Sequence, residues 1–320
     1  MECIFGSWLN AIGLYAIVIF LIDTLKSPLS YLLYSIIGSR KPLPEKYGKW
    51  AVITGSSDGI GKEYAAQLAK AKMNLLLISR SETKLAKIAV EFRIKYGVEV
   101  KYLVIDFSDG AEVYDKIQEA IKDLEVGVLV NNVGMLNDQP IRFDKISKEE
   151  IQHTFTVNML STARMTHLVL PEMRRRRRGI IINIASGAGE LHVGFATMYS
   201  SSKAFVISFT KAMQQELIGS GVECQLVKTL MVDTKMVKEW QRSGPTGLFI
   251  ADLHEYGKSA FATIGKISET TGCTSHAIQL MVSHALPDWF VTFWLSFYMR
   301  FMTRMNNKAR RAQKEAELKQ

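Results

Sequence analysis

The sequence predicts an α/β fold in which one mostly parallel sheet is covered by helices on both faces. Apolar, β-branched runs alternate with helical patterns through most of the chain, which is the order that parallel strands and crossover helices produce. Several of these runs are apolar without alternation, as expected for strands buried on both faces. No internal repeat or low-complexity linker interrupts them. We therefore predict one doubly wound domain over residues 48–285, with additional segments at both ends.

The predicted elements follow one another at regular spacing. The strands are expected at Trp50–Ile53, Leu75–Ser79, Val100–Ile105, Val128–Val130, Ile180–Ile184 and Val222–Val227. The helices are expected at Lys62–Lys70, Glu82–Tyr96, Ala111–Lys122, Lys148–Met173 and Ser200–Ile218. The stretch Lys235–Phe261 mixes apolar residues with few charges, so we expect it to form a lid suited to a lipid-like substrate.

Residues 1–47 are interpreted as a membrane anchor and an interfacial spacer. Residues 3–22 carry no charge, and a helix of about 20 residues spans the ~30 Å hydrocarbon core of a bilayer. A signal peptide fits less well, because the chain starts with Glu2 and shows no small-residue cleavage site after Ile22. A buried core helix is the other alternative. Five basic residues follow, which places the remaining chain in the cytosol by the positive-inside rule: Lys26, Arg40, Lys41, Lys46 and Lys49.

Two shorter apolar stretches are expected at the membrane surface. Ser27 and Pro28 resemble a helix start before the apolar run Leu29–Ile37. Residues 286–320 form an apolar, aromatic segment followed by a basic tail, and the stretch between Asp288 and Arg300 is too short to span a bilayer. This segment is interpreted as interfacial or as a hydrophobic partner surface. The tail either faces anionic headgroups or forms a solvated charged helix.

The composition excludes several classes of protein. With 48% hydrophobic and 22% charged residues, the chain is neither disordered, collagen-like nor a coiled-coil rod. The net charge of +9 is local, because the run Arg174–Arg178 supplies +5 and residues 300–320 supply another +5. The remaining body is nearly neutral, so no nucleic-acid partner is predicted. The arginine run is expected to be a solvated loop, with contact to phosphates of a lipid or of coenzyme A as the alternative.

No metal site is predicted. The cysteines, Cys3, Cys224 and Cys273, form neither a disulfide framework nor a zinc motif. The histidines show no spacing typical of metal ligands: His153, His167, His192, His254, His276 and His284.

A glycine-rich loop follows the first predicted strand and opens a helix. It reads Thr54-Gly55-Ser56-Ser57-Asp58-Gly59-Ile60-Gly61-Lys62. Glycines permit a tight turn and let the backbone approach a pyrophosphate, which the amides at the start of the next helix can bind. Arg80 follows the second strand, where an arginine can pair with a 2′-phosphate. The loop therefore predicts a dinucleotide site, and Arg80 favours NADP(H) unless it is only a solvated residue.

Further along the chain, a set of motifs resembles the short-chain dehydrogenase/reductase family over nearly all of residues 48–235. After the glycine loop come Asp106, Asn131-Asn132-Val133-Gly134, Asn158, Ser186 and Tyr199-Ser200-Ser201-Ser202-Lys203, in the family's order and spacing. Val133 stands where members usually have alanine. The resemblance implies a Rossmann fold, a homodimer, and catalysis by Tyr199, Lys203, Ser186 and Asn158. It implies cofactor binding by Gly55, Ser57, Asp58, Gly59, Ile60, Gly61, Arg80, Asp106, Asn132, Gly134, Tyr199, Lys203 and Thr234.

The chemistry of carbonyl reduction explains these residue types. An alkoxide formed at the substrate must take a proton, and a free tyrosine, with a pKa near ~10, holds its proton too tightly near neutrality. Lys203 lies one helical turn after Tyr199, so we expect its charge to lower that pKa. Ser186 is expected to polarise the substrate carbonyl. By resemblance, Lys203 also holds the nicotinamide ribose, and Asn158 holds a water of a proton relay. Asp106 either holds the adenine or caps the turn at Ser108.

The apolar N-terminus and the Thr-Gly-Ser-Ser-Asp-Gly-Ile-Gly loop are similar to one branch of the family. That branch contains very-long-chain 3-oxoacyl-CoA reductases and 17β-hydroxysteroid dehydrogenases of the endoplasmic reticulum, which use NADP(H). The resemblance implies reduction of a 3-oxoacyl-CoA or an oxosteroid at the endoplasmic reticulum membrane, by a domain facing the cytosol. Thr229 stands where the family usually has proline after the sixth strand. The alternative is therefore a catalytically weak or inactive protein that serves as a lipid-associated binding module.

Overall fold

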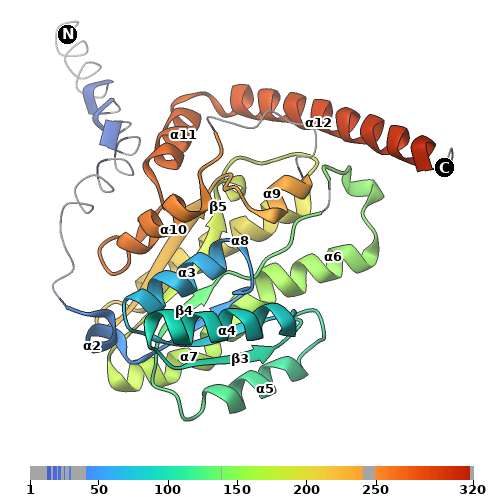
Figure 1. The fold of residues 1–320 in the computed structure, drawn as a ribbon. Coiled ribbons are helices and arrows are strands. Elements are labelled where there is room, and N and C mark those ends of the chain that lie inside the picture. The colour runs from blue at the N-terminus through green and yellow to red at the C-terminus, as the bar shows by residue number, and fades with distance from the viewer. Residues whose placement is uncertain are drawn as a thin grey trace, which may run out of the picture.

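A computed structural model shows one parallel sheet between two layers of helices (Figure 1). The structure describes residues 41–137, 139–240 and 249–317, together with single residues and short runs between 13 and 29. The predicted anchor and the run Leu29–Ile37 therefore lie mostly outside the described residues. Among those that are described, no helix combines the length and the apolar character needed to cross a membrane.

The strands run in the order β3-β2-β1-β4-β5-β6-β7, and all neighbours are parallel. Their bounds are β1 Trp50–Thr54, β2 Asn74–Ser79, β3 Val100–Val104, β4 Val126–Asn131, β5 Gly179–Ser186, β6 Val222–Thr229 and β7 Glu269–Thr270. The strand order reverses between β1 and β4, which confirms the doubly wound fold. The strand missed by the sequence is β7, which has only two residues and hence no readable pattern.

The helices before the catalytic strands agree with the predictions to within a few residues. They are α3 Gly59–Lys70, α4 Glu82–Tyr96 and α5 Glu112–Ile121. The short helix α2 Leu43–Tyr47 precedes them and was not predicted. The caps explain their ends. Asp58 accepts a hydrogen bond from the Gly59 amide and starts α3, while Gly97 ends α4 in the left-handed conformation at φ 65°.

The predicted helix Lys148–Met173 is wrong as a single α-helix. It consists of α6 Lys148–Phe155, a π-helical turn η2 Thr156–Leu160, and α7 Ser161–Arg176. A capping box between Ser147 and Glu150 starts α6. The remaining elements are η1 Phe143–Lys145, η3 Gly187–Gly189, α8 Thr197–Glu216, α9 Lys235–Trp240, α10 Leu253–Ala262, α11 Thr274–Ala285 and α12 Asp288–Glu317.

Successive residues of β1 pack into two different cores. Ala51 and Ile53 join the core beneath α3, α4 and α10, whereas Val52 joins the core beneath α5, α7 and α8. All five residues of β1 are buried, because helices cover both faces. Each buried aliphatic side chain contributes roughly 1.5–3 kcal/mol, so the run without alternation reflects this double burial.

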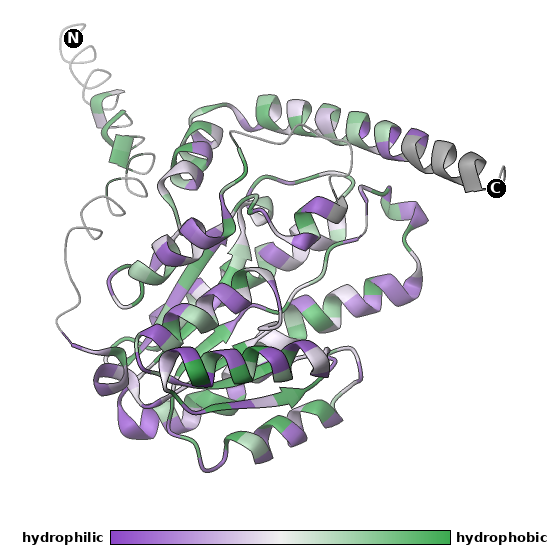
Figure 2. Ribbon diagram, viewed as in Figure 1, coloured by the Kyte–Doolittle hydropathy of each residue, from purple (hydrophilic) through white to green (hydrophobic). Residues whose placement is uncertain are grey.

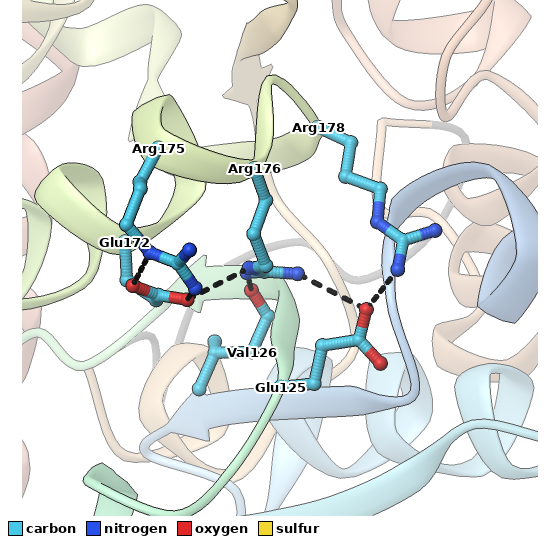
Figure 3. Close-up of polar contacts among 6 residues, drawn as sticks. All are labelled: Glu125, Val126, Glu172, Arg175, Arg176 and Arg178. Atoms are coloured by element: carbon cyan, nitrogen blue, oxygen red, sulfur yellow. Dashed lines mark hydrogen bonds and ion pairs between the residues drawn. The ribbon is translucent and has the colours of Figure 1, made fainter.

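The arginine run belongs to the scaffold rather than to a freely solvated loop (Figure 3). Arg175 pairs with Glu172 at 2.7 Å, and Arg178 pairs with Glu125. Arg176 is largely buried; it lies 3.3 Å from Glu125 and donates to the first carbonyl of β4 at 2.8 Å. The run precedes the first residue of β5, an eight-residue strand, so about 25 Å separates it from the carboxyl edge of the sheet. It ties α7 to β4 at the opposite edge.

The lid prediction for Lys235–Phe261 is wrong over its second half. The structure places α10 against α3, where a Cβ on Gly257 would lie 2.6 Å from the Glu63 Cβ. Tyr256 and Ala260 belong to the core beneath α3 and β1. Residues 241–248 lie outside the described part of the chain. Apolar residues of α10 face this core, which sequence composition alone cannot distinguish from a substrate lid.

Candidate active site

The predicted site residues gather at the carboxyl edge of the sheet. The glycine loop follows β1, Arg80 follows β2, and Gly134 follows β4. Ser186 ends β5 and lies in register with Thr229, which ends β6. Because all these strands are parallel, segments distant in sequence meet at one edge next to the point where the strand order reverses.

Ser186, Tyr199 and Lys203 lie together. Tyr199 and Lys203 are one turn apart on α8, and the Lys203 Nζ lies 5.7 Å from the centre of the Tyr199 ring. The Ser186 side chain lies close enough to the Tyr199 hydroxyl to oppose the effect of burial on the pKa of Tyr199. The Lys203 ammonium is almost fully buried and donates to the carbonyl of Ile184 at 3.0 Å. The arrangement offers a hydroxyl pair next to a buried cation.

The structure does not show the expected lowering of the Tyr199 pKa by Lys203. Burial raises the pKa of Tyr199 above its ordinary value, and only the hydrogen bond with Ser186 acts against it. The same burial lowers the pKa of Lys203 to about 8. Desolvation penalises the charged form of each side chain. The prediction that Lys203 brings the phenol toward neutrality therefore fails for this arrangement.

Asn158 is fixed by the backbone on the far side of the site. Its Oδ1 accepts from the Met135 amide at 2.7 Å, and its Nδ2 donates to the Met135 carbonyl and to Ser202, each at 2.9 Å. A Cβ on Gly134 would lie 3.6 Å from Asn158 Oδ1 and 3.4 Å from Lys203 Nζ. Asn158 lies within the π-helical turn η2, a feature frequent at functional sites. Asn158, Gly134 and Lys203 are thus neighbours.

The glycine loop is a close-fitting cradle. Gly55 and Gly59 have φ of 64° and 54°, a region that favours glycine. A side chain at Gly61 would collide with the Gly55 carbonyl and the Asn132 amide. Asn132 Nδ2 donates to the carbonyls of Thr54 and Gly55 at 3.0 and 3.1 Å, so it holds the loop. The backbone is accessible for close approach of a ligand, and the amides of α3 start there.

The other loop residues have distinct partners. The Ser57 and Ser79 hydroxyls are 2.6 Å apart, which joins the loop to the end of β2. Ile60 packs against the core. Asp58 accepts from Lys84 at 2.7 Å. That hydrogen bond lowers the pKa of the Asp58 carboxyl. These contacts order the loop before α3.

Arg80 is exposed and can reach a ligand beside the loop. Its side chain is 77% exposed and lies 3.6 Å from Asp106. Asp106 Oδ1 also accepts from the amide and hydroxyl of Ser108, at 3.0 and 2.7 Å. Burial acts to raise the pKa of Asp106, but the bonds from Ser108 and the charge of Arg80 lower it overall. The structure thus shows the cap at Ser108, and Arg80 has a weak partner that an anionic ligand could replace.

The segment after β6 is held by a histidine that sequence reasoning did not assign. His276 Nδ1 accepts from the Leu230 amide at 3.2 Å, and its Nε2 lies 3.1 Å from the Met231 carbonyl. Burial lowers the pKa of His276, so the ring is neutral and can do both. The backbone directly after Thr229, the position where the family usually has proline, is therefore tied to α11. Further on, Thr234 lies against the glycine loop, 3.3 Å from where a Gly59 Cβ would be.

A partly buried ion network lies beside Ser186. Lys228 Nζ lies 3.0 Å from Glu190 and 2.6 Å from Glu269, and Glu190 also contacts His284 at 3.4 Å. Burial acts to raise the pKa of Glu190, but the bonds and charges of His284 and Lys228 lower it to about 2. The network joins the loop after β5 to β6, β7 and α11. Lys228, directly after the predicted strand Val222–Val227, was the sequence signal for this network.

The geometry therefore fits a nicotinamide dinucleotide beside a proton-donating triad of Ser186, Tyr199 and Lys203. In the part of the chain that the structure describes, no three histidine, cysteine or acidic residues are arranged to hold a metal ion. A family model described as short chain dehydrogenase matches residues 49–244. The chain belongs to the short-chain dehydrogenase family, and it is an oxidoreductase acting on CH–OH and C=O groups.

Among known proteins, the chain is similar to the very-long-chain 3-oxoacyl-CoA reductase of Anas platyrhynchos. The two are 39% identical over 288 residues, covering 88% of each chain. It is 37% identical over 253 residues to the inactive hydroxysteroid dehydrogenase-like protein 1 of Homo sapiens, covering 79% of this chain and 77% of that one. A solved structure of a short-chain dehydrogenase from Sphingobium yanoikuyae in complex with NADPH has a TM-score of 0.63 and 27% identity, covering 69% and 86%.

Proposed function

We propose that the protein uses NADPH to reduce the carbonyl group of a lipid substrate, either a 3-oxoacyl-CoA or a 17-oxosteroid. The observation that carries the proposal is the convergence of Ser186, Tyr199 and Lys203 at the edge of the sheet that also carries the glycine loop. The names of similar proteins support both substrate classes, since they include very-long-chain 3-oxoacyl-CoA reductases and hydroxysteroid dehydrogenase-like proteins.

The side chains perform the proton chemistry. The reduced nicotinamide, when bound, supplies a hydride to the carbonyl carbon. Ser186 donates a hydrogen bond to the carbonyl oxygen and polarises it, and Tyr199 donates its proton to that oxygen. Burial keeps the phenol protonated and ready to donate. Lys203 holds the nicotinamide ribose and favours the phenolate left after proton transfer, while Asn158 positions the Met135 backbone at the site.

Arg80 supports NADP(H) over NAD(H). The guanidinium follows β2, where the ribose of a dinucleotide lies in this fold, and it is exposed with one carboxylate partner at 3.6 Å. No carboxylate takes the place of Arg80 directly after β2. A 2′-phosphate offers Arg80 a bidentate charge-assisted partner, which a ribose hydroxyl does not. The residues Gly55, Gly59, Gly61, Asn132 and Thr234 would hold the rest of the cofactor.

The cellular setting is part of the proposal. An uncharged run at residues 3–22 followed by basic residues supports an anchor in the endoplasmic reticulum membrane with the catalytic domain in the cytosol. This orientation would give the catalytic domain access to NADPH and to acyl-CoA. A homodimer is expected by analogy with the family.

The test is a cofactor-oxidation assay with the purified full-length protein. NADPH consumption is followed against a panel of 3-oxoacyl-CoAs of increasing chain length and 17-oxosteroids, with Tyr199→Phe as the matched control. We expect turnover of one class by the wild-type chain and almost none by the variant. Equal rates for both proteins would refute the catalytic role of Tyr199.

A catalytically weak or inactive protein is the second candidate. Thr229 replaces the usual proline, and a relative of 37% identity bears the name inactive hydroxysteroid dehydrogenase-like protein 1. If the protein binds NADPH and lipid but oxidises no cofactor with any member of the panel, this candidate replaces the first. A Thr229→Pro variant that gains turnover would assign the defect to this position.

A further inference from the structure

Helix α12 presents its aromatic side outward. Trp289, Phe293, Trp294 and Phe297 have exposed fractions of 72, 61, 51 and 57%, and Phe290, Phe301 and Met305 on the same side are also exposed. The five aromatic rings between Trp289 and Phe297 form a continuous series, with neighbouring centroids 5.7 to 6.1 Å apart. In Figure 2, hydrophobic ribbon (green) alternates with paler turns along the first half of α12. Soluble proteins rarely expose so many large aromatic side chains together, so this face has a partner.

The opposite side of α12 is fixed to the catalytic domain. Met299 and Met302 are buried, and Met299 packs in a cluster with Val193, Ala196 and Tyr199. The Thr303 hydroxyl lies 3.4 Å from the Pro140 carbonyl. In Figure 1, α12 runs along the top of the molecule as one continuous helix. A partner on the outward face is thereby held above the segment that carries the catalytic tyrosine.

The charges of the outward face select an anionic partner. Arg300, Arg304 and Lys308 recur at intervals of four residues and continue the aromatic face toward the C-terminus. All three are exposed. Between Trp289 and Lys308 there is no acidic residue, so a second copy of this helix would bring cations together without counterions. Tryptophan and phenylalanine beside basic residues are typical of helices that lie in the interface of a bilayer.

We propose that α12 is the surface by which the catalytic domain docks on an anionic lipid bilayer, with its axis in the plane of the headgroups. The docking itself does not depend on the proposed lipid substrate. Only the reason for docking, which is access of that substrate to the active site, rests on the proposed function. The aromatic side chains enter the acyl boundary, and the cations meet the headgroups. Since the buried side of α12 packs beside Tyr199, docking places the active site next to the lipid phase.

The test measures the depth of α12 in vesicles. The full-length chain, with Cys3→Ser, Cys224→Ala and Cys273→Ser, receives Phe293→Cys and an environment-sensitive fluorophore. The matched control is Ile94→Cys on α4, a site that is 81% exposed and far from α12 in sequence. Both proteins are reconstituted in phosphatidylcholine vesicles with and without phosphatidylserine, and brominated lipids serve as quenchers. We expect quenching at position 293 at least about fivefold stronger than at position 94, and stronger with phosphatidylserine.

Each outcome decides one part of the proposal. Equal, weak quenching at both positions refutes docking. If the label is buried in detergent without lipid, and two copies cross-link at position 293, the partner is a second copy of the protein. Arg300→Gln with Arg304→Gln should remove the phosphatidylserine effect, and no change would refute the charge argument. If position 293 is quenched but the protein reduces no carbonyl, the docking proposal stands and the proposed function is wrong.

Phe293→Ser with Phe297→Ser supplies the functional measurement. These side chains point away from the catalytic cluster, so KM for a soluble short-chain ketone should not change. The apparent KM for a long-chain substrate embedded in vesicles should rise about tenfold, because less apolar surface enters the bilayer. Equal KM changes for both substrates would indicate damage to the fold and contradict docking as the cause.

Discussion

Lys203→Met should stabilise the folded protein at neutral pH while abolishing carbonyl reduction. Burial lowers the pKa of Lys203 from 10.5 to about 8. A pKa difference of one is worth about 1.4 kcal/mol, so keeping this lysine charged at pH 7 costs the folded state about 3 kcal/mol. The substitution removes that cost but strands the Ile184 carbonyl that Lys203 binds at 3.0 Å. Because an unpaired carbonyl costs about 1–3 kcal/mol, the net gain is up to about 2 kcal/mol.

The pH dependence gives the sharper test. Below about pH 8 both the folded and the unfolded wild-type chains hold the proton on Lys203, and the full cost is present. Between about 8 and 10.5 the folded chain has lost this proton while the unfolded chain keeps it, so wild-type stability rises with pH. The methionine variant lacks this rise. The advantage of Lys203→Met should therefore shrink from pH 7 to pH 10 and finally reverse.

The assay is urea denaturation of both proteins in one detergent, followed by circular dichroism from pH 7 to pH 10. The matched control is Lys211→Met, an exposed lysine two turns further along α8. This control should follow the wild-type pH dependence. If the difference between wild type and Lys203→Met is the same at every pH, Lys203 is not a buried cation, and the electrostatic reasoning fails.

Four further substitutions test other parts of the structure. Tyr199→Phe should lower kcat at least about a hundredfold and leave the Kd for NADPH, measured by fluorescence, unchanged. Arg80→Asp should lose about 1.5–3 kcal/mol of NADPH binding and shift the ratio of kcat/KM toward NADH by roughly 10- to 150-fold; an unchanged ratio makes Arg80 a solvated bystander. Glu190→Gln should lower the free energy of unfolding by about 1–3 kcal/mol at pH 7, because buried Lys228 loses a charged partner. Since the folded pKa of Glu190 is about 2, this difference should be present above about pH 4.5 and vanish as the pH falls through 2 in urea titrations. Arg176→Ala should cost about 1–3 kcal/mol of stability without changing KM for an acyl-CoA; a raised KM would favour the phosphate-binding alternative.

The strands and the motif set could be predicted from the sequence because both are local. Double burial makes β1 and most of β5 apolar; Gly55 follows the last residue of β1, and Ser186 is the last residue of β5. Parallel strands place such loops at one edge, so the candidate site followed from order alone. The one-turn spacing of Tyr199 and Lys203 was sufficient to bring them together on α8.

Tertiary structure decided the features that depend on neighbours far apart in the chain. Lys228 meets Glu190 and Glu269, and His276 holds the backbone that replaces the usual proline segment. Burial, which no local pattern measures, raises the pKa of Tyr199, whereas the spacing of Tyr199 and Lys203 had suggested that this pKa would fall.

Helix α12 also combines features that the sequence determines with one that only the tertiary structure decides. The sequence determined that residues 286–302 are aromatic and that the following residues are basic. Only the packing of Met299 and Met302 on the catalytic domain decided which side of α12 faces outward. Composition sets what a helix can bury, but the available neighbouring surface decides which side it does bury, and that surface here is built from loops more than 90 residues earlier in the chain.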